Sequence, residues 1–355
     1  MAITRNDVAK LAGVSTATVS YVTNNGPRPV AEETRQKVLR AIQVLGYHPS
    51  AIARSLKTHK TCTVGIIIPD IVNPLVALLA QTIEDELLSA DYNLIICNSK
   101  ESHERERAYL QMLVSKQVDG IITTPSGGNH DMLVSMAKSG KRIVLFDRKV
   151  DGLDVDCVLF DNEGGAYAGV QHLISLGHSR IGMINLPPWL TPGAGRLKGY
   201  ERALHDAGLS VDPLLIESGT HTAEEAFSLA EEMLSLDNPP TAMFVSSNRL
   251  ARGVLRFVKE HGLRMPDDLA LCVFDDIDYY AYITPSITAI GHDYRQFGRE
   301  AVRLLMENIK RKDAHEPQIV TLPYQLHVRE STVGLKAPCG QADPLTITRA
   351  VHTDS

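Results

Sequence analysis

From residue 63 onward, short apolar runs alternate with longer stretches in which apolar residues recur every three or four positions. The short runs have the length of buried strands, and the longer stretches have the period of amphipathic helices. Strands are predicted at residues 64–68, 94–97, 120–123, 143–146, 157–160, 181–184, 214–216, 242–245 and 269–274. Helices are predicted at residues 75–88, 104–116, 132–139, 166–176, 196–207, 223–236 and 250–261.

This alternation with short links predicts an α/β fold of parallel sheets covered by helices on both faces. About ten strands fit two sheets better than one. No sequence repeat of solenoid length occurs, so a repeat protein is excluded.

The first 48 residues follow a different pattern, that of three short helices. Thr4 precedes the first helix with Asp7 three residues on, and Gly13 interrupts it. Ser15 then precedes a helix over residues 16–23, and a third runs from about residue 31 to 45 before Gly46. Two short helices joined by a tight turn and closed by a third predict a helix-turn-helix head.

The second helix of this head carries the candidate DNA contacts. Val19 and Val22 form its apolar face, which leaves small or hydroxyl-bearing side chains on the other face: Thr16, Ala17, Ser20 and Tyr21. Such side chains let a helix enter a major groove and hydrogen-bond base edges or phosphates. The alternative is an ordinary surface helix with small residues.

Composition changes this picture little. The chain of 355 residues is 44% hydrophobic and 22% charged, which is typical of a globular protein. No apolar run is long enough to span a membrane, and the N-terminus has no secretory pattern, so we expect a cytoplasmic protein near the nucleoid. Five scattered cysteines without a Cys-x-x-Cys pair indicate neither disulfides nor a thiolate zinc site.

Charge is divided unevenly between the two parts. Residues 1–60 hold nine Lys and Arg and three acids, a charge of +6, so the chain's net −6 leaves −12 on the remainder. A basic head on an acidic body suggests a polyanionic partner for the head. A solvated basic face would give the same count, so charge alone leaves both readings open.

Polar side chains gather where predicted strands end. Asp70 and Asn73 follow the first strand, and Asp147 and Arg148 follow the fourth. Ser247 and Asn248 follow the strand at 242–245, and Asp275 and Asp276 follow the strand at 269–274. Ligands of open α/β sheets bind at these ends. Carboxylates, amides and arginine suit sugar hydroxyls, although salt bridges or helix caps would use the same residues.

Several motifs together resemble the lactose/galactose repressor (LacI/GalR) family. Residues 7–20 (DVAKLAGVSTATVS) match its DNA-binding head nearly residue for residue, as do LGYHP at 45–49 and ARSL at 53–56. Tyr21 departs from the pattern, because the family often has Arg or His at this position. The resemblance implies that two subunits bind a pseudo-palindromic DNA operator, each reading one half-site.

The resemblance also assigns the parts of the chain. Residues 1–48 would form the helix-turn-helix domain and residues 49–61 a hinge helix and linker. That hinge would fold on operator DNA, with Arg54 and Leu56 against the duplex and Leu56 wedged into a base step. Residues 62–333 would bind the effector and dimerise. The tail, 334–355, lacks leucine heptads, so we expect it to be disordered and the protein to be a dimer.

For the body the resemblance implies a periplasmic-binding-protein-like fold: two doubly wound lobes with a ligand in the cleft between them. Lobe 1 would hold residues 62–160 and 291–318, and lobe 2 residues 161–290 and 319–333. The chain would thus cross near Asp161, Gly291 and Ile319. Closure of the lobes around a small molecule is the expected motion.

By family position, Arg196 and Asp275 are the main expected effector contacts, followed by Asp147 and Asn73. His221 and Asn248 complete the expected set. We expect a sugar or sugar derivative, because Leu190 and Pro192 offer no polar side-chain atoms where the purine-responsive member has Arg and Thr. Trp189 beside this cleft would either cover a sugar ring or pack on its own loop.

Two other function classes remain as alternatives: a sugar-converting α/β enzyme and a solute-binding protein without a transcriptional role. No catalytic residue, metal site or cofactor is predicted. Thirteen histidines form no His-x-x-x-His or His-Glu-x-x-His motif, and Gly164-Gly165 lacks the pattern of a dinucleotide site.

Overall fold

The structure is a computed structural model that describes residues 3–23, 29–47, 60–219, 221–311, 313 and 316–333. Contacts divide the chain into two compact units, Met1–Cys62 and Thr63–Ser355. The expected tail, and Arg54 and Leu56 of the expected hinge, lie outside the described residues.

The first unit is a three-helix head made of α1 (Arg5–Ala12), α2 (Thr16–Thr23) and α3 (Glu32–Leu45). Its small core is built from valines on all three helices, closed by Tyr47. Thr4 and Asp7 form a capping box at the start of α1, and Ser15 Oγ accepts the Thr18 amide at 3.1 Å. Gly13 and Gly46 end α1 and α3 in the left-handed conformation, as the sequence predicts.

The second unit contains two six-stranded sheets, one in each lobe. The first has the order β11-β5-β4-β3-β1-β2 and the second β12-β10-β9-β8-β6-β7. All neighbouring strands are parallel except β10 and β12, which are antiparallel. The first five strands of each lobe share the order 2-1-3-4-5, a doubly wound topology that binds ligands at the carboxyl ends of its strands.

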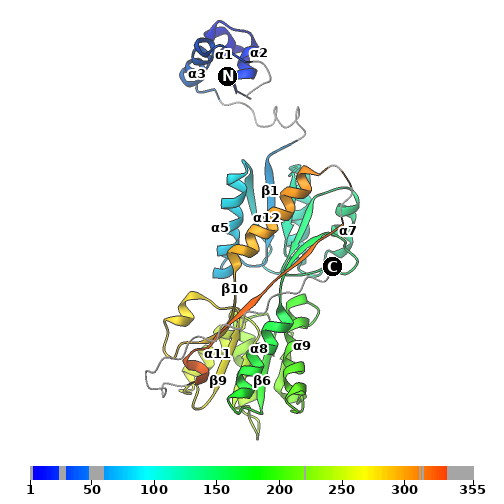
Figure 1. Cartoon of the computed structure of the whole chain (residues 1–355), viewed down its shortest axis with the longest axis vertical. Coiled ribbons are helices and arrows are strands. Elements are labelled where there is room, and N and C mark those ends of the chain that lie inside the picture. Colours follow the sequence, from blue (N-terminus) through cyan, green and yellow to red (C-terminus); the bar gives the residue numbers. More distant parts are fainter. Residues whose placement is uncertain are drawn as a thin grey trace. The chain divides into compact units, whose positions relative to one another are not determined.

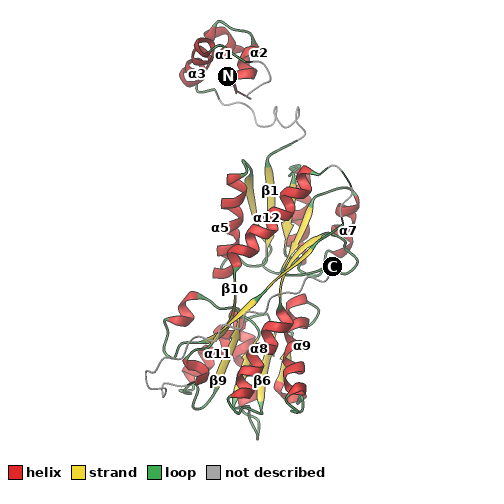
Figure 2. Cartoon of the chain, viewed as in Figure 1, coloured by secondary structure: helices red, strands yellow, loops and turns green. Residues whose placement is uncertain are grey.

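The first lobe has helices on both faces of its sheet, as Figure 2 shows. Helices α5 and α12 contribute to the hydrophobic cluster on one face, and α6 and α7 to the cluster on the other. Its strands are β1 (Thr63–Ile68), β2 (Asn93–Asn98), β3 (Gly120–Thr123), β4 (Ile143–Phe146), β5 (Asp156–Phe160) and β11 (Ile319–Leu322). Its helices are α5 (Pro74–Ser89), α6 (His103–Ser115), α7 (His130–Lys138) and α12 (Tyr294–Lys310).

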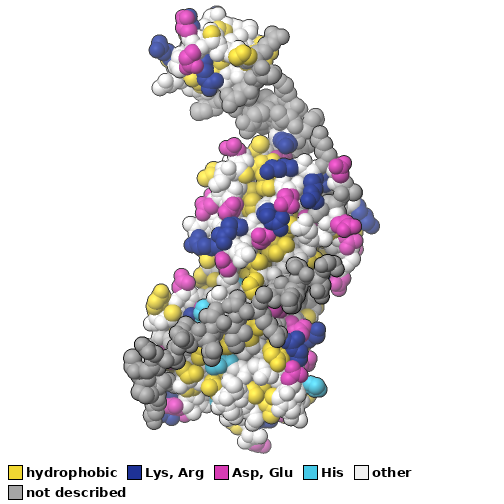
Figure 3. Space-filling model, viewed as in Figure 1, with side chains coloured by type: hydrophobic (Ala, Val, Ile, Leu, Met, Phe, Trp, Pro, Cys, Tyr) yellow, Lys and Arg dark blue, Asp and Glu magenta, His cyan; other side chains and the backbone are white. Residues whose placement is uncertain are grey.

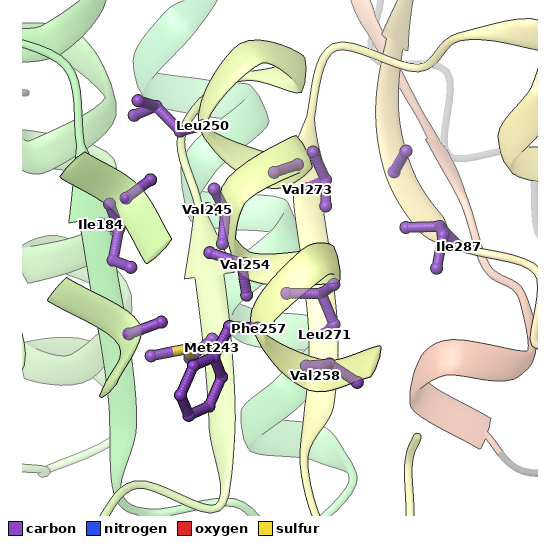
Figure 4. Close-up of a cluster of buried hydrophobic side chains, with 14 of the residues drawn as sticks. Ile184, Met243, Val245, Leu250, Val254, Phe257, Val258, Leu271, Val273 and Ile287 are labelled. Carbon is purple, nitrogen blue, oxygen red and sulfur yellow. The ribbon is translucent and has the colours of Figure 1, made fainter. Parts of the chain in front are cut away.

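The second lobe repeats this arrangement. Its strands are β6 (Ile181–Asn185), β7 (Ile216–Ser218), β8 (Ala242–Val245), β9 (Ala270–Phe274), β10 (Thr288–His292) and β12 (Tyr324–His327). Its helices are α8 (Asn162–Ser175), α9 (Thr191–Asp206), α10 (Ala223–Leu234), α11 (Asn248–Glu260) and the short α13 (Glu330–Val333). Figure 4 shows α11 placing Val254, Phe257 and Val258 over residues of β8 and β9 such as Val245 and Leu271.

The chain passes between the lobes three times, after β5, after β10 and after β11. We expected the last crossing near Ile319, and this was wrong. Residues 319–322 pair with β5 and belong to the first sheet, so the crossing lies at Pro323. Figure 1 shows β11 and β12 following one another from lobe to lobe. The error arose because β11 is a partly exposed edge strand that lacks a continuous apolar run.

Two element predictions also need correction. The strand expected at 214–216 is a 3-10 turn, Pro213–Leu215, followed by β7, because Asp212 caps the turn and Pro213 suits its first position. Helix α9 begins at Thr191, so Arg196 lies inside the helix rather than opening it.

No helix of the described residues is long and apolar enough to cross a membrane. Basic and acidic side chains are interspersed on the face of the first lobe seen in Figure 3. On α12, for example, Arg303 pairs with both Glu300 and Glu307. This mixed surface differs from a single-sign patch that would attract a polyanion.

Candidate functional site

A small cavity of about 80 Å³ lies between the two lobes. It is lined by residues that directly follow strands of both sheets, among them Pro69, Asp147, Leu186 and Asp275. The carboxyl ends of the two sheets therefore meet at one place, as the doubly wound topology requires. Five of the six expected effector residues line this cavity: Asn73, Asp147, Arg196, Asn248 and Asp275.

Asp147 and Asp275 occupy equivalent positions in the two lobes. Each follows the fourth strand of its sheet, β4 or β9, and each has a left-handed backbone, with φ of 65° and 75°. This conformation costs about 1 kcal/mol or more in a residue with a side chain and often marks functional sites. Burial raises the pKa of Asp147, opposed by the charges of Arg148 and Arg196.

Arg196 is held from several sides. Helix α9 approaches α8 closely, since a Cβ at Gly199 would lie 2.3 Å from the Glu163 carbonyl oxygen. Arg196 Nε donates to Asn162 Oδ1 at 2.9 Å, and Nη1 donates to the Ser246 carbonyl. The guanidinium stacks on Phe274 at 3.6 Å from the ring centre.

Arg196 and Asp275 are thereby brought together. Arg196 Nη1 lies 3.6 Å from Asp275 Oδ2, and Tyr294 Oη donates to Asp275 Oδ1 at 3.0 Å. Tyr294 begins α12 of the first lobe, so this hydrogen bond joins the lobes. Tyr294, Asn162 and Ser246 are functional residues that the sequence does not reveal, because their only signal is a position beside a helix start.

A reciprocal amide pair also joins the lobes. Asn73 Nδ2 donates to Asn248 Oδ1 at 3.2 Å, and Asn248 Nδ2 donates to Asn73 Oδ1 at 3.0 Å. Asn73 caps α5 by accepting the Leu75 amide, and Asn248 is the first residue of α11. Leu75 itself belongs to the hydrophobic cluster of the second lobe. The cleft is therefore filled largely by its own side chains, which explains its small volume.

Glu101 forms a third connection between the lobes. It accepts two hydrogen bonds of 2.8 Å from Arg148 and one of 3.3 Å from Arg249 of α11. Burial opposes the charged form, but the hydrogen bonds and charge of Arg148, with the charge of Arg249, outweigh it and lower the pKa of Glu101 to about 2.

His221 is the expected effector residue that lies away from the small cavity. Its carbonyl accepts from Arg249 at 3.4 Å, and burial lowers the pKa of its imidazole while the nearby Glu101 charge raises it. Its Nδ1 is buried without a hydrogen-bond partner. Among the described residues no group of three potential metal ligands occurs.

Four of the six expected DNA contacts lie together on α2, and the other two, Arg54 and Leu56, lie outside the described residues. Thr16 and Ala17 are exposed, Ser20 and Tyr21 are partly buried, and Val19 and Val22 form the buried face of the helix. The structure therefore orients α2 as the sequence pattern predicts, with its small and hydroxyl-bearing side chains away from the core.

Comparison with known families identifies both units. Residues 4–50 match the model of bacterial regulatory proteins of the lacI family, and residues 170–332 match that of a periplasmic binding protein-like domain. The HTH-type transcriptional repressor PurR of Photobacterium profundum is 35% identical over 333 residues, covering 94% of this chain and 99% of the relative.

Two solved structures resemble the chain over nearly its whole length. The Lac repressor dimer bound to operator and the anti-inducer ONPF is 25% identical, with a TM-score of 0.83, and the match covers 94% of this chain and all of that one. The complex of the transcriptional regulator CelR with cellobiose is 28% identical, with a TM-score of 0.70, and the match covers 93% and 99%. With its head, its body and its relatives in agreement, the chain belongs to the LacI family of bacterial regulatory proteins.

Proposed function

We propose that this protein is a sequence-specific transcriptional repressor that binds a pseudo-palindromic operator as a dimer and is controlled by a small carbohydrate. The observation that carries the proposal is the joining, in one chain, of a helix-turn-helix head to a two-lobed body with a polar cleft. The relatives named as repressors, one of them solved on its operator, support the same function. Its place of action would be the cytoplasm, where the DNA lies.

For DNA binding we propose that Thr16, Ala17, Ser20 and Tyr21 face the major groove. We further propose that residues 1–48 act as the reading head and residues 49–61 as the hinge. In that hinge Arg54 would contact phosphate and Leu56 would wedge between bases, an insertion that costs a few kcal/mol and is offset by contacts to the bent duplex.

For the effector we propose the cleft residues Asn73, Asp147, Arg196, Asn248 and Asp275 as direct contacts. Carboxylates and amides accept and donate to sugar hydroxyls, and buried Arg196 supplies fixed donors. A cavity of about 80 Å³ holds little more than water, so ligand entry requires the lobes to separate or the Asn73–Asn248 pair to open. His221 would act on the ligand through Arg249.

Control of DNA binding would follow from a difference in effector affinity between two lobe arrangements. The effector would change the separation of the two hinges in the dimer. Either direction of control, release from DNA or recruitment to it, is consistent with this coupling.

The test pairs selection of bound fragments from genomic DNA with thermal-shift screening of sugars on the full chain. We expect retention of a palindromic fragment and at least one sugar that both raises the melting temperature and changes DNA affinity. If a sugar raises the melting temperature but the protein retains no specific DNA fragment, the protein would instead be a solute-binding protein. Turnover of the sugar would favour an enzyme.

A further inference from the structure

A second and larger cavity, of about 490 Å³, lies beside the first and also lies between the lobes. Its walls come from the segment between β3 and α7, from Arg148–Asp151 after β4, and from the loop between β6 and α9 with the start of α9. Its volume lies within the range of small-molecule sites, whereas the first cavity is far below that range.

Cationic side chains outnumber acidic ones around this cavity. Arg148 and Lys149 line it, against the single carboxylate of Asp151, and the imidazole of His130 lies beside them. Lys149 and His130 are exposed, and neither has an ion-pair partner within the part of the chain that the structure describes. Arg148 already forms an ion pair with Glu101. Lys149 is therefore the cation that remains available to a ligand.

Two helix N-termini border the same cavity. Asn129 precedes α7 and Leu190 precedes α9, and neither side chain caps its helix. The Leu190 side chain has no hydrogen-bond acceptor. The Asn129 side-chain amide donates instead to Glu106 and to the His103 carbonyl. The positive dipole ends of helix N-termini attract anions. Pro192 in the first turn of α9 has no N–H, and the first turn of α7 also carries Asp131, so the dipoles act beside fewer free amides and one further carboxylate.

Arg148 connects the two cavities. It lines both of them, and its side chain is 7% exposed. Its two terminal nitrogens donate to Glu101 and one also to the Pro125 carbonyl, but its buried Nε has no hydrogen-bond partner. Asp147 Oδ2 lies 3.9 Å from this Nε, which is too far for a hydrogen bond. An unsatisfied buried donor of this kind indicates a missing acceptor.

An aromatic surface faces this cationic cluster. Trp189, the one tryptophan of the chain, lines the cavity and is 70% exposed, with Pro188 beside it. The ring is therefore not packed on its own loop. An exposed, rigid indole next to polar groups is typical of ligand-binding surfaces.

We propose that this second cavity is an anion-recognising subsite for the effector, so that the effector is a carbohydrate carrying a phosphate or carboxylate group. The anion would lie against Lys149 and the N-termini of α7 and α9, and the sugar ring against Trp189. The remaining hydroxyls of the sugar would extend past Arg148 into the first, smaller cavity. This inference rests on the proposed function, since it names the chemical class of the ligand of that regulator.

The test is calorimetric titration of the full chain with matched ligands. Glucose is compared with glucose 6-phosphate and glucuronate, ribose with ribose 5-phosphate, and inorganic phosphate serves as the minimal anion. We expect one anionic form to bind at least tenfold more tightly than its neutral parent. The phosphate and carboxylate members of the set distinguish the two anion classes.

Variants locate the subsite. Lys149→Ala is expected to lower the affinity for the anionic sugar about tenfold and to leave the neutral parent unchanged, and Lys149→Arg is expected to retain binding. Lys116→Ala removes an exposed lysine of the same lobe that lines neither cavity and is expected to change nothing.

Equal affinity for neutral and charged forms, or an anion preference that survives Lys149→Ala, overturns the subsite while leaving the proposed regulator intact. If no carbohydrate of the set binds, the subsite and the carbohydrate part of the proposed function fail together. Operator binding, measured on the same preparation, then tells whether the repressor function itself still stands.

Discussion

At the scale of single residues, the cleft is dominated by charged side chains that have been removed from water. Arg196 is 3% exposed and depends on Asn162, Ser246, Asp275 and the Phe274 ring. Buried charges are tolerated only when they are paired and hydrogen-bonded. The same groups that would hold a ligand therefore also stabilise the cleft.

Arg196→Ala is expected to lower the free energy of unfolding of the body by about 3 kcal/mol, because Asp275 is then buried without its cation. Chemical denaturation of the full chain measures this free energy. The loss of stability should be accompanied by a loss of effector binding. Arg264→Ala is the control, since its pairs with Asp267 and Asp268 are exposed and should matter little. A variant with unchanged stability would mean that Arg196 does not secure the cleft.

The Glu101 cluster predicts a specific pH dependence. Because the folded-state pKa is about 2 and the ordinary value is 4.5, Glu101 stabilises the fold above about pH 4.5. This stabilisation, roughly 3 kcal/mol at most, is lost as the pH falls from about 4.5 toward 2. Glu101→Gln should therefore show a shallower fall in unfolding free energy between pH 6 and pH 3 than the unchanged chain. Parallel curves would contradict the strong pairing with Arg148.

At the scale of elements, helix starts bring most of the site together. Asn73 lies at the start of α5, Asn248 at that of α11 and Tyr294 at that of α12, and all three project into the region between the lobes. Helices α5 and α11 follow parallel strands and begin at the carboxyl edge of their sheets, so their first residues meet the opposite lobe. Helix α12 begins where the chain crosses from β10 of the second lobe into the first. The amide pair and the Tyr294–Asp275 bond are consequences of this topology.

Asn248→Ala is expected to weaken the contact between the lobes, because it leaves the Asn73 side-chain amide without its partner across the cleft. Small-angle scattering should show an increase in the radius of gyration, and the melting temperature should fall by a few degrees. Asn238→Ala, at an exposed position of the same lobe, is the matched control. An unchanged scattering curve would show that the other inter-lobe contacts suffice.

At the scale of the whole molecule, charge is divided between two functions. The +6 of residues 1–60 favours phosphate contacts, whereas the −12 of the rest opposes them. Non-specific binding should therefore depend on the head and hinge.

Non-specific DNA affinity is expected to fall linearly with the logarithm of salt concentration, because each phosphate contact releases counterions. Arg54→Ala should reduce the size of that slope by about one and weaken binding to all sequences alike. Fluorescence anisotropy with a random duplex measures the slope, with Lys116→Ala as a control in the body. An unchanged slope would exclude Arg54 as a phosphate contact.

Local patterns in the sequence were enough to predict the two kinds of domain and most elements, because periodicity and capping are local properties. The pattern of Val19 and Val22 oriented α2, and the apolar runs located the strands that Asp147 and Asp275 directly follow. The contacts across the cleft follow only from the packing of the lobes: Tyr294 donates to Asp275, Asn73 and Asn248 exchange hydrogen bonds, and Arg249 pairs with Glu101. It also placed β11 in the first sheet and His221 outside the small cavity. These contacts join residues far apart in the chain, so their partners follow from the packing of two lobes, which no local pattern encodes.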